Sequence, residues 1–255
     1  MPRIPATATD PPIQQLCDAC AKASVDGNQP ETARTINRIM DSLSAADLGL
    51  KGTGDRGGGS ETIRTQSIYE GSDFEVVIFL FPARARIPFH DHPGMTVFSK
   101  VIYGALSMVS LDWDEPLSKE EVRTLNAEQE RQDLIAEQPL AKHSGQATNE
   151  AAAIFAPRGV HARADTVLTP EAPAFMLRPD FANIHCFEAQ TECAVLDVLL
   201  PPYNDEDRSC HYYELLPEGA EPSTARELRL RVIAPPDSLV IRRGEYVGPA
   251  VRPPS

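Results

Sequence analysis

Two histidines stand two residues apart in the stretch Ile87-Pro88-Phe89-His90-Asp91-His92-Pro93-Gly94, at the end of an apolar run and before a tight Pro-Gly turn. Side chains on a β-strand alternate between its faces, so His90 and His92 are expected on the same face. Two imidazoles presented side by side offer a transition metal two of its ligands. A pair of solvated histidines is the weaker interpretation, because the flanking run is apolar.

Composition limits the classes of partner. The chain has 255 residues and a formal net charge of −13, which disfavours nucleic acid and anionic membranes as partners. No apolar run approaches the length of a membrane span, and the first residues lack a secretory signal pattern. The five cysteines are an odd number, which favours free thiols in a reducing compartment. We therefore expect a cytoplasmic and/or nuclear protein, acting as a monomer.

The first part of the chain is predicted to be helical. Apolar residues recur at helical spacing after Pro12 and again after Pro30. Cys17 and Cys20 have the spacing of a redox or zinc motif, but both lie on the apolar face of the first helix and no second pair completes a zinc site, so burial is the better interpretation.

A glycine-rich segment follows these helices. Residues 52–57 match the dinucleotide pattern G-x-G-x-x-G, but they follow no strand and lead into no helix, so we interpret them as a flexible linker. The predicted organisation is a helical segment and linker over residues 1–60, a β domain over 61–249 and a tail over 250–255.

From residue 73 onward, short apolar runs separated by glycine and proline predict strands and hence a β-sandwich or barrel on which the helices pack. Two of these runs flank Gly104 and are expected to form a hairpin. A polar segment over 114–150 is expected to be a variable excursion. The predicted strands cover residues 74–81, 97–103, 105–113, 152–155, 174–177, 183–187, 193–200, 212–216, 227–233 and 238–242.

The two histidines need a third donor, and His185 is the natural candidate. It lies in a late apolar run, where the second half of a barrel returns beside the first, and a buried imidazole needs partners for its nitrogens. His143 falls in the polar segment and His161 in a probable turn, so both are expected to be solvated. His211 lies between a cysteine and a tyrosine and has no assigned role.

Further polar residues stand out near the end of the chain. Asp197 interrupts an otherwise apolar strand, and burying an unpaired carboxylate is so costly that it should meet a cation, a histidine N–H or a substrate amine. Tyr203 follows two prolines that force a turn at the rim of the barrel. Cys210 and Tyr212 have strand spacing on one face, as ordinary packing or as a pair that could react.

Ordered motifs from about Ile13 to Pro249 together resemble the cysteamine dioxygenase and plant cysteine oxidase family. The common cupin motif places a glutamate four or five residues after the histidine pair, where this chain has Thr96 or Val97. Ala182 replaces a residue that is often glycine in the plant members. The motifs are His90-Asp-His92-Pro-Gly-Met95, Ser99-Lys-Val-Ile-Tyr103-Gly104, Asn183-Ile-His185, Leu196-Asp197-Val-Leu, Pro201-Pro-Tyr203, Cys210-His-Tyr212-Tyr213, Ala225-Arg-Glu-Leu and Glu245-Tyr-Val-Gly-Pro249.

The resemblance implies a mainly β fold of the cupin type, a double-stranded β-helix or jelly-roll barrel. It implies one Fe(2+) bound by His90, His92 and His185. The implied reaction adds O2 to a substrate thiol to give a sulfinic acid. The position of Asp197 in an apolar strand predicts an active-site role for it, either orienting a ligand histidine or receiving the substrate amine, and Tyr203 at the rim is the second catalytic candidate.

The same resemblance implies that Cys210 and Tyr212 can become covalently joined. It also favours the N-terminal cysteine of a protein or peptide as substrate, with cysteamine as a small surrogate. The enzyme would then act as an oxygen sensor whose product enters N-degron degradation in the hypoxia response.

Two alternatives remain open at this stage. A dioxygenase for free cysteine would need an arginine for the substrate carboxylate, and Arg84 and Arg86 share the parity of His90 but are expected to be solvated in a turn. A cupin that binds metal without catalysis is possible too, although a buried Asp197 would have no use in it.

Overall fold

The computed structural model describes residues 10–52, 62–127, 155–204, 207–222 and 227–254. It begins with α1 (Pro12–Asp26) and α2 (Pro30–Ser42), each with proline in its first turn, where a missing N–H costs nothing. A short 3-10 helix, η1 (Ala46–Leu48), follows. The predicted helices are thus confirmed. Cys17 and Cys20 are fully buried free thiols, as predicted.

Within the described residues, twelve strands form two sheets. The first sheet has the order β12-β1-β2-β9-β4-β7, and the second closes on itself in the order β10-β11-β6-β5-β8-β3. The strands are β1 (Ile63–Glu70), β2 (Glu75–Phe81), β3 (Arg86–His90), β4 (Thr96–Tyr103), β5 (Leu106–Trp113), β6 (Arg158–Leu168), β7 (Phe175–Leu177), β8 (Ile184–Ala189), β9 (Cys193–Leu200), β10 (Tyr212–Leu216), β11 (Leu228–Ile233) and β12 (Ile241–Gly244).

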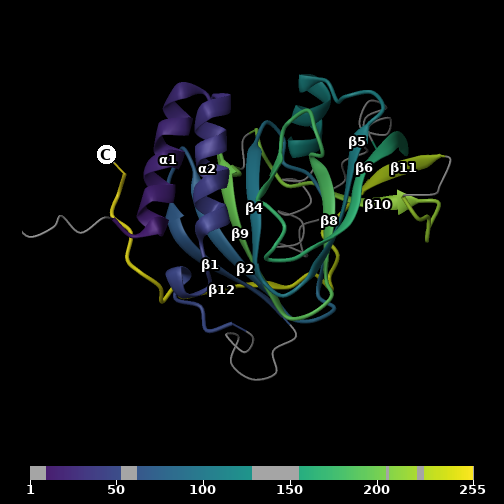
Figure 1. Cartoon of the computed structure of the whole chain (residues 1–255). Helices are drawn as coiled ribbons and strands as arrows, with labels where there is room; N and C mark the ends of the chain where they lie inside the picture. The colour runs from purple at the N-terminus through teal and green to yellow at the C-terminus, as the bar shows by residue number, and fades with distance from the viewer. Residues whose placement is uncertain (1–9, 53–61, 128–154, 205–206, 223–226, 255) are drawn as a thin grey trace, which may run out of the picture.

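The two helices lie side by side against one face of the first sheet (Figure 1). Their apolar faces share one core cluster with alternate residues of β2, β4 and β9, among them Ile78, Phe98 and Leu196. The opposite face of that sheet packs on the second sheet through another cluster, which contains Phe187 and Val195. This arrangement is the predicted double-stranded β-helix with N-terminal helices packed on it.

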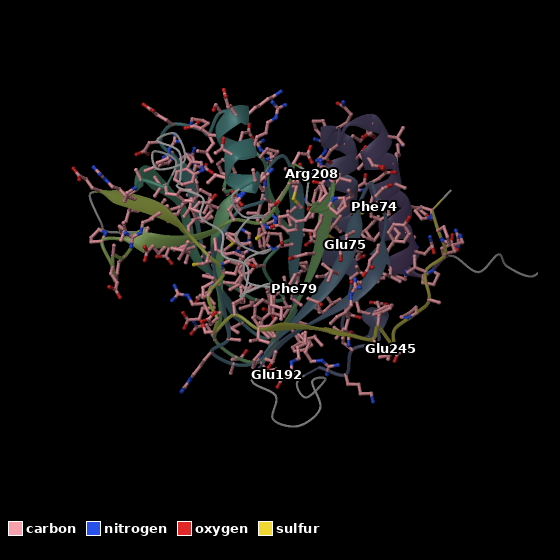
Figure 2. All side chains as sticks on the ribbon, turned by 180° about the vertical axis from the view of Figure 1, so that it is seen from behind. Phe74, Glu75, Phe79, Glu192, Arg208 and Glu245 are labelled. Carbon is pink, nitrogen blue, oxygen red and sulfur yellow. The ribbon has the colours of Figure 1, made fainter. Side chains whose placement is uncertain are left out.

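The hairpin predicted around Gly104 is wrong. β4 pairs with β7 and β9, whereas β5 pairs with β6 and β8, so Gly104 carries the chain from one sheet to the other. Its φ of +82° and the 2.2 Å between an added Cβ and the Glu192 carbonyl oxygen explain why glycine stands there. Figure 2 places Glu192 at the end of the barrel opposite Arg208. Gly104, which contacts Glu192, therefore lies at the end of the barrel away from Arg208.

Several further predictions differ from the structure or lie outside the described residues. His161 lies within β6, not in a turn, and both β1 and β6 were missed. The predicted strand at 152–155 lies outside the described residues except for Phe155, which is in a turn. Most of the predicted linker and His143 lie outside them as well. In the polar segment, residues 119–127 are helical. No helix in the described part of the chain combines the length and apolar character needed to cross a bilayer.

Candidate metal centre

The three candidate ligands meet at one end of the barrel. β3 ends at His90, and His185 lies directly opposite it in the antiparallel pair β3–β8. His92 lies beyond the end of β3, in the turn that follows, so the expectation that both histidines share a strand face is wrong. The turn nevertheless returns the His92 side chain to the other two.

Their geometry is that of a compact donor set. The ring centroids of His90 and His185 are 4.3 Å apart, and that of His92 lies 5.2 and 5.1 Å from them. One nitrogen from each ring can be chosen so that all three lie within 4.8 Å of one another. The exposed fractions are 8%, 5% and 1% for His90, His92 and His185, so solvent does not compete for these nitrogens.

Each ring has its Nδ1 directed to another protein group. His90 Nδ1 lies 2.9 Å from the Pro88 carbonyl oxygen, and His92 Nδ1 lies 2.6 Å from the Tyr203 hydroxyl. His185 Nδ1 faces the Asn183 carbonyl oxygen at the longer distance of 3.5 Å. An N–H at Nδ1 that donates to an outer acceptor leaves Nε2 with a free lone pair, which is the usual tautomer of a metal-binding histidine.

The electrostatics favour the same protonation state. Burial lowers the pKa of His90 and holds the pKa values of His92 and His185 well below the usual histidine range. For His185, the two neighbouring histidines lower the pKa further. All three imidazoles are therefore neutral near pH 7, as metal ligands must be. Three neutral nitrogen donors and no carboxylate suit a divalent transition metal such as iron, zinc, copper or nickel.

Tyr203 and Asn183 hold His92 from outside the donor set. The Tyr203 hydroxyl donates to the Asp91 carbonyl oxygen at 2.7 Å, which leaves its oxygen to accept the His92 Nδ1–H, and the two rings are stacked. The Asn183 amide accepts the His92 backbone N–H and donates to the His92 carbonyl oxygen, both at 2.9 Å. Tyr203 therefore orients a ligand ring, and Asn183 fixes the backbone of the same ligand.

The residue before Asn183 has an unusual backbone conformation. Ala182 has a φ of +56°, in the left-handed region that favours glycine, and it is 5% exposed. This is the position at which the plant members often have glycine. The left-handed turn aims Asn183 at His92.

Ala182→Val should therefore destabilise the metal-free protein by about 2 kcal/mol or more, because a β-branched side chain tolerates positive φ poorly. Ala182→Gly removes the strain but also a buried methyl group and backbone restriction, so its stability should stay within about 1 kcal/mol of the parent. Urea unfolding of both variants measures the contrast. Equal stabilities for valine and glycine would contradict it.

Asp91, between two candidate ligands, is the centre of a buried network that sequence reasoning missed. Its carboxylate accepts the His211 backbone N–H at 2.9 Å, the His211 Nδ1–H at 3.1 Å and the Tyr213 hydroxyl at 2.6 Å. Asp91 is 4% exposed and the two donors are 1% exposed. The network ties the ligand-bearing turn to the start of β10. The available signal was a carboxylate between two histidines at the end of an apolar run.

Asp197 faces the interior between the two sheets. Asp197 lies two residues after Val195 on β9, so both side chains are on the same face of that strand. Val195 shares a core cluster with Phe187, which in turn lies two residues after His185 on β8. The Asp197 Oδ1 atom is buried without a hydrogen-bond partner among the described residues. The pKa of Asp197 is raised to about 7 by burial, the largest cause, against a lowering by the Ser99 hydroxyl and with a smaller raising by the nearby Glu75 carboxylate. The carboxyl can therefore change its protonation state near neutral pH.

This raised pKa predicts a pH dependence of stability in the metal-free protein. The folded state keeps the Asp197 proton up to about pH 7, whereas the unfolded chain loses it near pH 4. The stabilising contribution is complete below about pH 4 and is lost as pH rises to about 7, a change on the order of 4 kcal/mol. Asp197→Asn should flatten the unfolding profile over this range in urea titrations. A variant whose profile still follows the parent would contradict the assignment.

Cys210 lies between two phenols. The Tyr203 and Tyr212 hydroxyls are both within hydrogen-bonding reach of its thiol, and burial raises the pKa of Cys210 to about 12. Tyr212 lies opposite His90 in the pairing of β10 with β3. The thiol is therefore protonated at neutral pH and placed beside the metal-bearing strand.

The remaining candidates lie apart from this group. His161 is bonded through Nδ1 to the exposed Asp114 at 2.9 Å, and its side chain is 43% exposed. Arg84 and Arg86 are exposed, Arg84 in a turn with a φ of +68° and Arg86 on β3. Neither arginine is placed in the structure to bind a substrate carboxylate at the histidines.

Comparisons with known proteins identify the family of this chain. The family model PCO_ADO matches residues 39–251. Plant cysteine oxidase 2 of Arabidopsis thaliana is 32% identical over 216 residues, which are 79% of this chain and 66% of that protein. The 2-aminoethanethiol dioxygenase of Homo sapiens is 32% identical over 195 residues, which are 73% of this chain and 67% of that protein. This chain thus spans slightly less than two thirds of the plant relative.

Among solved structures, KdgF from Halomonas sp. matches with a TM-score of 0.33 and 14% identity, over 57% of this chain and 84% of that one. Such a distant match adds nothing to the topology described above. The family model, in contrast, covers most of the chain. The chain belongs to the PCO_ADO family, that of the plant cysteine oxidases and 2-aminoethanethiol dioxygenases.

Proposed function

We propose that the chain is a thiol dioxygenase that uses Fe(2+) held by His90, His92 and His185. The reaction is R–SH + O2 → R–SO2H, in which both oxygen atoms enter the sulfinic acid. The observation that carries the proposal is the set of three buried, neutral imidazoles whose Nδ1 atoms face other protein groups. Family membership supports it, since the relatives' names denote this chemistry.

The protein's contribution is orientation and charge. When bound, iron would supply the positions for thiol and O2 and the electrons that O2 activation needs. Three neutral imidazoles leave a cation's charge uncompensated, so a thiol that reaches the site is favoured as thiolate. Tyr203 keeps the His92 ring in place. Asp197 Oδ1, buried without a partner, is suited to accept a hydrogen bond from a substrate amine.

We infer that the substrate is an N-terminal cysteine of a protein or peptide, with cysteamine as a small surrogate. Both present a thiol and an amine two carbons apart, which a metal position and Asp197 could hold together. Free cysteine adds a carboxylate, and the exposed Arg84 and Arg86 are not placed to bind it. An enzyme of this kind in the cytoplasm or nucleus would make the oxidation of its target depend on oxygen, and so feed N-degron degradation.

The decisive assay compares kcat/KM for a Cys-initiated peptide, the same peptide N-acetylated, cysteamine and free cysteine, with product mass and oxygen consumption as readouts. We expect the free peptide to gain two oxygen atoms and the acetylated peptide to react at least tenfold more slowly, because it lacks the amine. Faster oxidation of free cysteine than of the peptide would overturn the substrate. Stoichiometric iron with no oxygen consumption would favour a non-catalytic metal-binding cupin.

The role of Asp197 has its own test. Asp197→Asn removes the carboxylate while keeping its size, so turnover of the peptide should fall although the metal content stays the same. A variant that folds, holds iron and retains full turnover would contradict this role.

Size-exclusion chromatography with light scattering tests the expected monomeric state.

A Cys210–Tyr212 thioether is a further expectation, because the thiol lies beside both Tyr212 and the β3 strand that carries His90. Its formation removes two hydrogens from the protein, and O2 is the acceptor of the two electrons and two protons. Intact mass after aerobic turnover should therefore fall by two hydrogens in part of the protein. Tyr212→Phe is the control, and an unchanged mass for the parent would leave the pair as packing.

A further inference from the structure

A cavity of about 770 Å3 lies against the turn that carries His92. Its wall includes Asp91 between the candidate ligands, Pro93-Gly94 directly after His92, and the Asn183-Ile184 segment before His185. Arg208 contributes from the loop after Tyr203, and Figure 2 shows it at the end of the barrel opposite Glu192. The far wall is the helix at 119–127, drawn in teal at the top of Figure 1. We call this cavity the rim groove.

The rim groove is adjacent to the metal centre but distinct from it. None of the three candidate ligands lines it. Gly94 in its wall is exposed, and a Cβ there would meet nothing within 4 Å, so the backbone of the ligand turn borders open space. The groove therefore borders the turn that carries His92.

The carboxylates of the groove are already paired. Asp112 is bonded to Arg163 at 2.5 Å, and Asp207 to Arg208 at 2.8 Å. The other acidic side chains of its wall face partners as well: Asp91 faces His211, Asp114 faces His161, and Asp180 faces Arg178.

Two cations in the groove have no such partner in the described part of the chain. Lys119 and Arg123 lie one helical turn apart, both exposed, and neither forms an ion pair or hydrogen bond with any residue that the structure describes. The wall as a whole is not positive, because it has five aspartates and four lysine or arginine side chains, so the positive charge open to a ligand is confined to these two side chains. The groove therefore favours an anionic group at its helix end.

We propose, on the basis of the function proposed above, that the rim groove binds the polypeptide that follows the N-terminal cysteine. Lys119 and Arg123 bind an acidic side chain a few residues downstream of that cysteine. The mixed, internally paired polar walls suit peptide groups, and the unpaired cations supply selectivity by charge. A small thiol such as cysteamine is too short to reach the helix end.

The test uses the full chain loaded with iron. The substrates are two Cys-initiated peptides of equal length, one with glutamates at positions four to eight and one with lysines there. The parent should prefer the acidic peptide by about tenfold in kcat/KM, through KM. Lys119→Glu/Arg123→Glu should reverse this preference. The acidic preference should also weaken as salt rises.

The matched control is Arg34→Glu/Arg38→Glu. These arginines are exposed at the same spacing on α2, which packs on the other sheet, and the change in net charge is identical. The control should keep the parent's preference between the two peptides, and thermal unfolding checks that both variants are folded.

The outcomes separate the two proposals. If peptides are oxidised but the groove variant keeps the parent's preference, or the parent has none, the groove assignment is wrong and the proposed function stands. If cysteamine is oxidised and no peptide is, the polypeptide substrate and the groove assignment fall together.

Discussion

His185→Ala is expected to lose its metal almost completely, whereas His161→Ala keeps it. His185 supplies one of three neutral nitrogens that lie within 4.8 Å of one another, and it is 1% exposed. Loss of outer partners of metal ligands already weakens affinity by about 10- to 100-fold, so loss of a ligand should exceed that. His161 interacts with the exposed Asp114 on β6 and touches none of the three rings. Metal analysis of dialysed protein, loaded with Fe(2+) anaerobically, measures the difference.

His92→Ala and His90→Ala should behave like His185→Ala, and Tyr203→Phe should fall between the groups. Phenylalanine keeps the ring that stacks on His92, but it lacks the hydroxyl that lies 2.6 Å from His92 Nδ1 in the parent. Circular dichroism of the metal-free variants separates loss of metal from loss of fold. Metal retained by His185→Ala and lost from His161→Ala would overturn the ligand assignment.

Local pattern was enough to predict the helices, most strands and the three histidines that the structure brings together. Proline at a helix start, alternating apolar runs and histidines in apolar contexts are properties of neighbouring residues, and all of them can be recognised in a sequence. His185 was identifiable because an imidazole in a buried strand needs partners. Tyr203 was correctly placed at the rim, although its contact with His92 depends on residues far apart in the chain.

Pairing between distant segments was not predictable in the same way. Gly104 between two apolar runs is compatible with a hairpin or with a step from one sheet to the other, and only the close approach to Glu192 distinguishes them. β6 was missed because only two of its eleven residues, Val160 and Leu168, are buried and several of the others are polar, which weakens the apolar signal of a strand. The contacts of Asp91 with His211 and Tyr213 join residues 120 and 122 positions apart.

The second large effect is expected at Asp91, because no other described carboxylate accepts hydrogen bonds from three buried donor groups. Asp91→Ala leaves the His211 backbone N–H, the His211 Nδ1–H and the Tyr213 hydroxyl without their acceptor. Burial, and then the Asp91 charge, hold the pKa of Tyr213 well above its usual range, so the phenol remains a donor. We expect the free energy of unfolding of the metal-free protein to fall by about 3–5 kcal/mol.

The matched control is Asp114→Ala, which breaks an aspartate–histidine pair of similar geometry. Because the Asp114 side chain is 56% exposed, this change should lower the free energy of unfolding by less than about 1 kcal/mol. Tyr213→Phe removes a single donor from the network and should cost about 1–2 kcal/mol. In the Asp91→Ala background the same Tyr213→Phe change should cost much less, because the hydroxyl has already lost its acceptor. Urea unfolding of the four proteins of this cycle measures the coupling. Equal costs for Tyr213→Phe in both backgrounds would show that Asp91 and Tyr213 act independently, and the turn that carries His90 and His92 would then not be held by this network.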